Sequence, residues 1–309
     1  MGVSALVLGG ALALDLAVGE PPRRAHPVAW FGRLVAAVDR PWRHSRAAGT
    51  AAAVGFPVAV GALVAGGVLA ASSVDPLAGA VVGAVAVFVS TSLRRLLDRV
   101  REVTAATETD PAAAREQLRA LAGRDASALS PGQVRSAAVE SLAENLADGL
   151  VAPLLYYGVA VACAAAVGAD PSVAVAAGCG AAAWAKGVNT LDSMLGYHTT
   201  PTGWGPARLD DAVMWLPARA SAVLLAVVFG RPGGLVRARR WQSGLASPNS
   251  GWPMGTLAAG LGVRLEKPGH YVLNPDAPLP DADAAGVAVR RVALAGLLAY
   301  ALTGAVTWS

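Results

Sequence analysis

Three carboxylates recur at four-residue intervals immediately before a long uncharged stretch. Glu140, Glu144 and Asp148 stand at positions i, i+4 and i+8, so a helix places them on one face. Residues 149–169 follow without a charge, and the acidic face therefore leads into an apolar segment. Like charges at this spacing repel one another, so we expect a cation to lie against them.

These oxygens suit a magnesium site. Mg²⁺ is commonly held by one or two carboxylates together with substrate phosphates, and Asn145 adds an amide oxygen beside Glu144. A solvated acidic face is the alternative explanation, and the position directly before an apolar segment favours the metal site. Ser130 and Gln133 have the spacing of a capping box, which predicts the start of the helix that carries the carboxylates.

A second polar cluster, Lys186, Asn189 and Asp192, follows the next hydrophobic stretch. Asn189 and Asp192 are three residues apart and share a helical face, so Asp192 joins the three earlier carboxylates as a predicted metal ligand. Lys186 has two explanations that stay open. Its ammonium either reaches the membrane surface from the end of a span, or it binds a phosphate.

A third cluster contains Arg208, Asp210 and Asp211. The two acids either mark a helix N-terminus, where the helix dipole favours negative charge, or belong to the site. Because adjacent aspartates point in different directions, we expect at most one of them to reach the same ion as Asp192. We interpret the three clusters as parts of one active site at the membrane surface.

The composition is that of an all-α, polytopic integral membrane protein. Of 309 residues, 54% are hydrophobic and only 15% are charged, unlike an average soluble domain. A bilayer core requires roughly 20 apolar residues per helix. Six stretches are predicted to span the membrane: residues 2–18, 47–74, 76–93, 149–169, 171–185 and 292–309.

Residues 212–230 are a weaker candidate because Pro217 and Arg219 interrupt them, and we predict a re-entrant or interfacial segment there. Arginines cluster in the loops at residues 23–46 and 94–101, which the positive-inside rule places in the cytoplasm. Both termini then lie outside, and the active site faces the cytoplasm. The same rule accounts for the net charge of +4 without a nucleic-acid partner.

We therefore expect one membrane-embedded catalytic domain over residues 1–309, in the cell membrane. It would carry a cytoplasmic helical insertion at about 94–148 and a cytoplasmic loop region at about 186–284. The sequence contains neither a phosphate-binding loop of the Gly-x-x-x-x-Gly-Lys-Ser/Thr type nor a strand-associated Gly-x-Gly-x-x-Gly. Any nucleotide must then bind at another kind of site.

Two loops rich in Gly and Pro each contain a tryptophan, Trp204 in one and Trp252 with Asn249 in the other. Such loops either place a rigid aromatic surface against a ligand or anchor the chain at the headgroup level. His26 follows the first apolar stretch, close to Glu20 in the sequence. A single loop histidine is more often structural than catalytic, so His26 is left outside the predicted site.

Several motifs follow one another along the chain. They are Leu14–Asp15–Leu16 with Gly19–Glu20–Pro21–Pro22 and His26–Pro27–Val28, then residues 140–149, 186–197, 207–211, 215–219 and 247–253. Together they resemble the cobalamin-biosynthesis family CobD/CbiB, adenosylcobinamide-phosphate synthase. The resemblance covers most of the chain. It implies an integral-membrane ligase that uses ATP and Mg²⁺ to join aminopropanol, or its O-phosphate, to the propionate carboxylate of adenosylcobyric acid.

The resemblance also suggests roles for the clusters. The predicted metal ligands are Glu140, Glu144, Asp148 and Asp192; the predicted catalytic residues are Glu140, Glu144, Asp192 and Asp211; and the predicted cofactor-binding residues are Lys186, Asn189, Trp204, Arg208, Asn249 and Trp252. A carboxylate that does not hold metal would deprotonate the incoming ammonium, and Arg208 or Lys186 would contact phosphate. Trp204 and Trp252 would pack against the corrin. Residues 198–202 are short and uncharged where family members often carry a longer, charged loop, which leaves the preferred amine open.

Two other classes of protein compete with this interpretation. A Mg²⁺-dependent membrane prenyltransferase also uses acidic motifs, but it usually has two tightly spaced Asp-rich motifs and more spans. A transporter would use intramembrane acids such as Asp15 to couple protons, with polar residues in the middle of its spans. The expected partners are the two substrates, membrane lipid and neighbouring enzymes of the cobalamin pathway.

Overall fold

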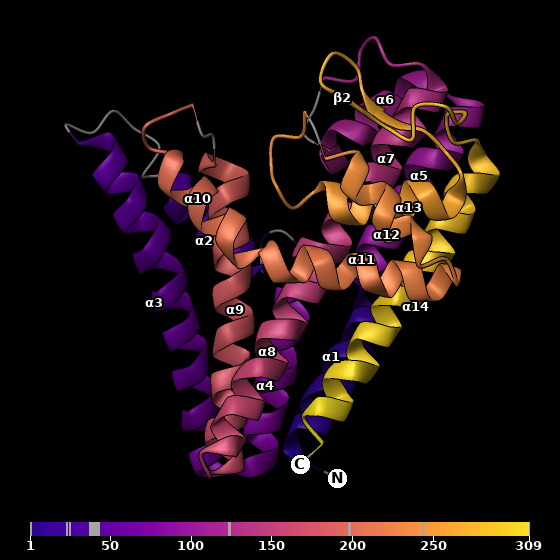
Figure 1. Cartoon of the computed structure of the whole chain (residues 1–309). Coiled ribbons are helices and arrows are strands. Elements are labelled where there is room, and N and C mark those ends of the chain that lie inside the picture. The colour runs from indigo at the N-terminus through magenta and orange to yellow at the C-terminus, as the bar shows by residue number, and fades with distance from the viewer. Residues whose placement is uncertain are drawn as a thin grey trace. The chain divides into compact units, whose positions relative to one another are not determined.

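The computed structural model is almost entirely helical and describes residues 2–22, 24, 26–36, 44–122, 125–196, 199–242 and 244–308 (Figure 1). Tyr197 and His198, at the loop where the sequence departs from the family, lie outside the described residues. The helices are α1 (Val3–Val18), α2 (Pro27–Ala36), α3 (Ser45–Val74), α4 (Pro76–Ser90), α5 (Arg94–Thr109), α6 (Pro111–Ala122), α7 (Pro131–Leu146), the π-helical turn η1 (Ala147–Val151), α8 (Ala152–Ala166), α9 (Pro171–Leu195), α10 (Trp204–Val213), α11 (Trp215–Phe229), α12 (Gly233–Arg240), α13 (Gly251–Leu261) and α14 (Ala282–Val306). The strands are β1 (Leu265–Lys267) and β2 (Tyr271–Leu273).

The all-α, polytopic membrane class is confirmed. Within the described residues, four helical segments are long and apolar enough to cross a membrane: Ser45–Val74, Pro76–Thr109, Pro131–Ala166 and Ala282–Val306. They correspond to four of the six predicted spans. The other two predicted spans fall on α1, which is apolar but shorter, and on α9, which is not among the four and carries Lys186 and Asp192.

Residues 212–230, which were predicted to be re-entrant or interfacial, consist mainly of helix α11, and a break separates this helix from α10. The chain is helical over α10 and again over α11, with the break at Met214, and the pair raises the number of candidate spans to five if it counts as one. Pro217, which we expected to interrupt this segment, instead lies in the first turn of α11, where a missing backbone N–H costs little.

Local signals in the sequence are realised as expected. Ser130 Oγ accepts a hydrogen bond from the backbone N–H of Gln133 at 3.3 Å, and Gln133 Oε1 accepts one from the N–H of Ser130 at 2.9 Å. This reciprocal pair is the capping box at the start of α7. Between α8 and α9 the chain turns at Gly168, whose φ of 74° is a left-handed conformation that favours glycine.

The chain divides into two compact units. Unit 1 comprises Met1–Ser92, Asp148–Met214 and Ala299–Ser309; unit 2 comprises Leu93–Ala147 and Trp215–Leu298. Unit 2 thus combines most of the predicted insertion with the later part of the predicted loop region, whereas the polar clusters at 186–211 fall in unit 1.

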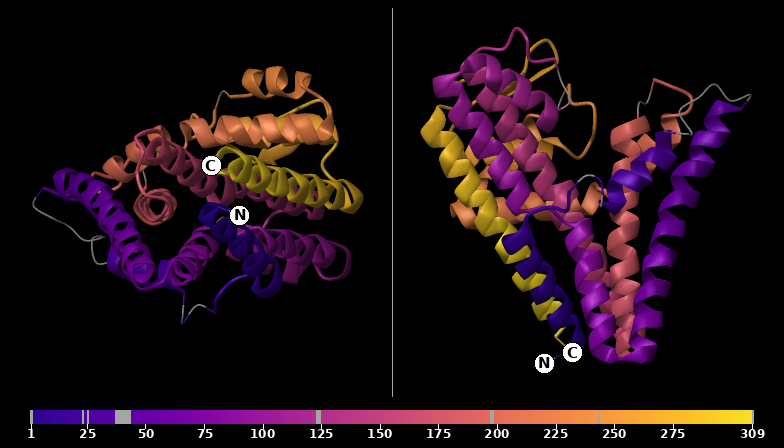
Figure 2. Two further views of the ribbon diagram at one scale, coloured as in Figure 1. Left: turned by 90° about the horizontal axis from the view of Figure 1, so that it is seen from below. Right: turned by 180° about the vertical axis from the view of Figure 1, so that it is seen from behind.

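In unit 1, α9 is the central helix and packs against α3, α4, α8 and α10. Figure 1 shows α9 between α3 and α8, and the left view of Figure 2 shows it nearly end-on. Small residues permit the close approach of α3 and α9. A Cβ added to Gly61 would lie 2.9 Å from the carbonyl oxygen of Gly180, and one added to Gly180 would lie 2.8 Å from that of Gly61. The helices therefore meet backbone to backbone, as is common in membrane bundles.

In unit 2, α7 packs against α5, α6, α13 and β1. The strands β1 and β2 form a short antiparallel hairpin that the sequence did not reveal, with Glu266 opposite Val272. The core around α7 and α13 includes the fully buried side chains of Leu142, Leu146 and Leu257. Burial of these aliphatic side chains stabilises the unit by roughly 1.5–3 kcal/mol each.

Candidate functional site

Three segments of unit 1 supply the polar side chains of the candidate site. Asp148 lies in η1; Lys186, Asn189 and Asp192 lie in the last third of α9; and Arg208, Asp210 and Asp211 lie in α10. An apolar cluster holds these segments together, because Ala152, Val188, Val213 and Met214 are buried against one another with Tyr156, Trp184 and Leu209 around them. The Tyr156 hydroxyl donates to the carbonyl of Val213 at 2.7 Å and so fixes the end of α10 to α8.

The π-helical turn changes the geometry of the acidic stripe. A regular α-helix was expected to carry Glu140, Glu144 and Asp148 on one face, but the helix widens over Ala147–Val151, and Asp148 lies inside this turn. Each π turn takes up an extra residue, so residues after it no longer continue the α-helical register. Such turns are frequent at functional sites. The turn also lies where the chain passes from unit 2 to unit 1.

Lys186 is the cation that the acidic stripe was expected to meet, at least for Asp148. Its ammonium interacts electrostatically with Asp148 and with Glu20. Lys186 is only partly accessible, which makes simple snorkelling to the membrane surface a poorer explanation than an interaction with these carboxylates. Asp192 is a second charged neighbour of Asp148.

Asp192 lies beyond the apolar part of α9 and has a perturbed acidity. Burial, with the negative charge of Asp211 as a second cause, raises the pKa of Asp192 to about 6. The electrostatic effect of Asp211 on Asp192 links the second and third polar clusters. A carboxylate with this pKa accepts a proton more readily than an exposed aspartate does, while it is still ionised at neutral pH.

Asp210 is the least satisfied acid of the group. Its Oδ1 atom is buried and has no hydrogen-bond partner among the described residues, although the side chain of Asn189 hydrogen-bonds the carboxylate. Asp148, Asp192 and Asp211 all act on it as neighbouring negative charges. A buried carboxylate oxygen without a hydrogen-bond partner destabilises the folded protein. A bound ligand that interacts with this oxygen would remove the penalty. The predicted catalytic residues include Asp211 but not Asp210, and the sequence contains no signal that ranks two adjacent aspartates.

Asp211 and Arg208 form a weak pair at the edge of the site. Their closest atoms, Arg208 Nη1 and Asp211 Oδ2, are 3.9 Å apart. The Arg208 side chain is 61% exposed, whereas that of Asp211 is 14% exposed. A long, exposed guanidinium in so loose a pair is able to move to an anionic ligand at little cost.

Glu20 and His26, which were not among the predicted site residues, lie at the edge of this cluster. His26 Nε2 is 3.3 Å from Glu20 Oε1, and His26 Nδ1 accepts a hydrogen bond from the N–H of Val28 at 3.2 Å. Because Glu20 also acts on the charge of Lys186, the N-terminal motif meets the site through this pair. Their position directly after the first apolar stretch was the available signal.

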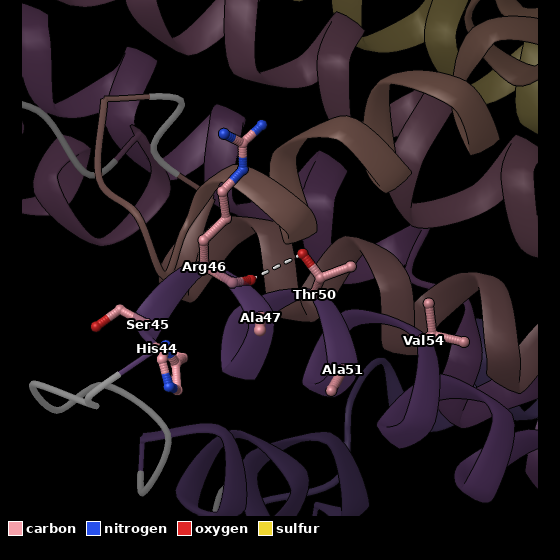
Figure 3. A pocket seen from close by; sticks show the side chains of 7 residues that line it. All are labelled: His44, Ser45, Arg46, Ala47, Thr50, Ala51 and Val54. Atoms are coloured by element: carbon pink, nitrogen blue, oxygen red, sulfur yellow. Dashed lines mark hydrogen bonds between the residues drawn. The ribbon is translucent and has the colours of Figure 1, made fainter.

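A cavity of about 820 Å³ opens at the start of α3, also in unit 1 (Figure 3). Its lining residues are His44, Ser45, Arg46, Ala47, Thr50, Ala51 and Val54. Thr50 Oγ1 donates to the carbonyl of Arg46 at 2.9 Å, and the Arg46 guanidinium lies 3.7 Å from the centre of the Trp204 ring. Trp204 therefore has an arginine over its ring, a cation–π contact that the sequence did not suggest. Its predicted packing against the corrin stays a prediction.

Glu140 and Glu144 belong to unit 2, whereas Asp148 belongs to unit 1. Glu140 is fully buried, so a solvated acidic face is the wrong description of it. Its Oε1 accepts from Ser136 Oγ at 2.9 Å and its Oε2 accepts from the Tyr271 hydroxyl at 2.8 Å. Ser136 Oγ in turn accepts from the N–H of Glu266 at 2.8 Å, which ties the hairpin to α7. These bonds account for the burial of Glu140 without a metal.

Of the four predicted metal ligands, Asp148 and Asp192 therefore lie together in unit 1, and the joint set of four stays a prediction. Among the residues that the structure describes, no group of three or more His, Cys, Asp or Glu side chains is arranged to hold a metal ion. An ion at this site would need oxygens from Asn189, water or substrate, which is the usual situation for Mg²⁺.

The remaining predicted residues, Asn249 and Trp252, lie in unit 2 beside Arg219. Asn249 is 4% exposed, and its Oδ1 accepts from Arg219 Nη1 at 3.2 Å. The guanidinium carbon of Arg219 lies 5.1 Å from the centre of the Trp252 ring. The sequence indicated Asn249 and Trp252 but not the arginine that joins them, and Trp252 lies in the first turn of α13 (Gly251–Leu261) rather than in a loop.

Comparison with known proteins agrees with the motifs. The family model described as CobD/Cbib protein matches residues 8–295. The chain belongs to the CobD/CbiB family. A probable cobalamin biosynthesis protein CobD of Methanothrix thermoacetophila is 33% identical over 97% of this chain and 95% of its own length. The cobalamin biosynthesis protein CobD of Rhodobacter capsulatus is 35% identical over 97% of this chain and 96% of its own. That of Klebsiella pneumoniae is 38% identical over 84% of this chain and 81% of its own. No solved structure matches this chain.

Proposed function

We propose that this CobD/CbiB family member acts in cobalamin biosynthesis as an ATP-dependent ligase. It would join aminopropanol, or its O-phosphate, to the propionate carboxylate of adenosylcobyric acid and so give adenosylcobinamide or its phosphate. The names of its relatives support the pathway. The observation that carries the chemistry is the buried, unpartnered Oδ1 of Asp210 among Asp148, Asp192 and Asp211. No comparison favours a prenyltransferase or a transporter.

The residues of unit 1 fit a magnesium ion that is shared with substrate phosphates. The carboxylates of Asp148, Asp192 and Asp210 and the amide of Asn189 are hard oxygen donors, and the unpartnered oxygen of Asp210 lacks the positive neighbour that such an ion would be. Because no three of the described acids are arranged around one ion, one or two of them would bind it directly, and phosphate and water would supply the remaining ligands. When bound, Mg²⁺ would neutralise charge on the phosphoryl group that ATP transfers. Glu140 and Glu144, which the sequence also predicted as ligands, lie in unit 2 and are not used in this proposal.

The reaction requires an activated carboxylate. A carboxylate is a poor acceptor for an amine, so the propionate oxygen would first attack the terminal phosphorus of ATP, forming an acyl phosphate and releasing ADP. The amine nitrogen would then form the amide bond as phosphate leaves. Lys186 and the exposed Arg208 are the cations of unit 1 that would stabilise charge on the phosphoryl oxygens.

One proton must leave the ammonium before it can attack. Asp211 is the carboxylate that we assign to this step, because Asp148, Asp192 and Asp210 are the ones that we assign to the metal. Its side chain is 14% exposed and lies 3.9 Å from Arg208, at the edge of the site. We place the enzyme in the cell membrane with this site facing the cytoplasm, where ATP is available.

The direct test uses purified protein in detergent with adenosylcobyric acid, ATP, Mg²⁺ and either aminopropanol or its O-phosphate, with the product followed by mass. We expect an amide product whose formation depends on ATP. The exposed loop acid Asp276 offers a matched control, since Asp276→Asn removes a charge outside unit 1. Absence of product with both amines would contradict the proposed function, and full synthesis by both Asp192→Asn and Asp210→Asn would contradict the metal assignment.

A further inference from the structure

Arg219 of unit 2 lies against two indole rings. Its guanidinium carbon is 4.1 Å from the centre of the Trp215 ring and 5.1 Å from that of the Trp252 ring. Trp215 precedes Arg219 by one helical turn in α11, and Trp252 comes from the start of α13. Two cation–π contacts on one guanidinium hold its plane in place more firmly than a single surface contact would.

The hydrogen bonds of Arg219 use only one of its nitrogens. Nη1 donates to the carbonyl of Trp215 at 2.7 Å and to Asn249 Oδ1 at 3.2 Å. Within the described residues, Nε and Nη2 donate no hydrogen bond, and no carboxylate forms an ion pair with this arginine. By contrast, Arg135 in the same unit pairs with Glu108 at 2.6 Å. The half-buried Arg219 therefore keeps an oriented edge with two unused donors.

We propose that the Nε–Nη2 edge of Arg219 binds the phosphate of a substrate, as a phosphate site additional to Lys186 and Arg208. Two parallel N–H donors match two oxygens of one phosphate, and such bidentate, charge-assisted pairs are among the strongest polar contacts. The two tryptophans and Asn249 hold the fork before the ligand arrives, which lowers the conformational entropy lost on binding. Trp215, the ring over which the guanidinium of Arg219 lies, is 52% exposed.

This inference rests on the proposed function for the identity of the phosphate. ATP and aminopropanol O-phosphate both carry the chemistry that the fork recognises, and free aminopropanol does not. The assignment gives Asn249 and Trp252 a defined role: they position Arg219 for a phosphate group. Lysine at position 219 would keep the charge but lose the planar fork and its two-oxygen geometry.

The test is a calorimetric titration of the purified full-length protein in detergent with inorganic tripolyphosphate, aminopropanol O-phosphate and free aminopropanol. We expect the wild type to bind at least one of the two phosphate probes. Arg219→Gln should weaken that binding by about 10-fold or more, and Arg219→Lys should weaken it by a smaller factor, because it retains a point charge. The probe that is affected identifies the source of the phosphate, and binding of free aminopropanol should not change.

Arg239→Gln is the matched control, because Arg239 is an exposed arginine of the same unit. An equal loss of binding in Arg239→Gln, unchanged binding in Arg219→Gln, or no binding of either probe by the wild type would each overturn the inference. Thermal unfolding shows whether Arg219→Gln is folded. If it is not, Arg219→Lys provides the test, because unchanged phosphate binding in that variant would also overturn the bidentate site.

The two proposals fail separately. Amide synthesis by the wild type is measured on the same preparation. If phosphate binding depends on Arg219 but no amide is synthesised, the proposed ligase reaction is contradicted and the phosphate site is supported. Synthesis together with unchanged phosphate binding in Arg219→Gln would remove the site and leave the reaction.

Discussion

Glu140 of unit 2 and Asp210 of unit 1 are both acids withdrawn from water, but their surroundings differ. Both oxygens of Glu140 accept hydrogen bonds from hydroxyl groups, those of Ser136 and Tyr271. Asp210 has one buried oxygen without a partner and three other carboxylates acting on its charge. Burial alone therefore does not mark an active-site acid. A buried acid whose oxygens are all hydrogen-bonded stabilises the fold. A buried acid with an oxygen that lacks a partner is the better candidate for ligand binding.

The largest expected effect is that of Asp210→Asn on amide synthesis. The substitution removes the negative charge that we assign to the metal and should lower kcat on the order of 100-fold or more. It also relieves repulsion from Asp148, Asp192 and Asp211, so the unfolding temperature should not fall. Product formation and thermal unfolding measure the two quantities on one sample. Full activity in this variant would place Asp210 with Glu140 as a structural acid.

Glu140→Ala should show the opposite pattern. The hydroxyls of Ser136 and Tyr271 would lose their acceptor inside the unit, which we expect to cost about 3 kcal/mol of unfolding free energy. Activity of the protein that remains folded should stay close to that of the wild type. The exposed Glu116 provides a control in the same unit, because Glu116→Ala should change stability by less than about 0.5 kcal/mol.

Loss of activity in Glu140→Ala at unchanged stability would reverse this comparison. It would support the prediction, made from the spacing of the acidic residues, that Glu140 binds the metal. Glu144→Gln, measured beside it, would then be expected to lose activity too, since the two residues are one helical turn apart.

The raised pKa of Asp192 predicts that the stability of the protein depends on pH. Because burial raises its pKa in the folded state to about 6 from 3.8, the folded protein favours the neutral carboxyl and ionisation opposes folding. With divalent ions removed by EDTA, acidification from roughly pH 7.5 to 5.5 should therefore raise the unfolding temperature through this group. The increase should be smaller in Asp192→Asn. An equal increase in both proteins would show that Asp192 does not titrate in this range.

The smallest expected effect is that of Tyr271→Phe. The substitution keeps the ring and removes the hydroxyl that donates to Glu140 Oε2 at 2.8 Å, so we expect a loss of about 1 kcal/mol of unfolding free energy. Denaturant unfolding in detergent measures it. In a double-mutant cycle with Glu140→Gln, the two effects should not be additive, because they break the same contact. Additivity would show that the hydroxyl stabilises the hairpin by another route.

Much of the fold followed from local sequence patterns. The apolar stretches predicted an all-α membrane protein, and Ser130 and Gln133 predicted the start of α7. These features depend on residues within a few positions of one another, so spacing and residue type are enough to reveal them. The order of the polar motifs was also sufficient to indicate the CobD/CbiB family.

Only the tertiary structure decided which polar residues meet. Glu140 bonds to Tyr271, 131 residues later in the chain, and Arg219 bonds to Asn249, 30 residues later. The sequence contained all four residues but no signal for these pairs, because contacts between distant segments depend on how the helices pack. Hydrogen-bond satisfaction is a property of the packed unit. For that reason the sequence was enough to identify the acidic residues as candidates. Only the packing of α8, α9 and α10 showed that Asp210 has a buried oxygen without a hydrogen-bond partner.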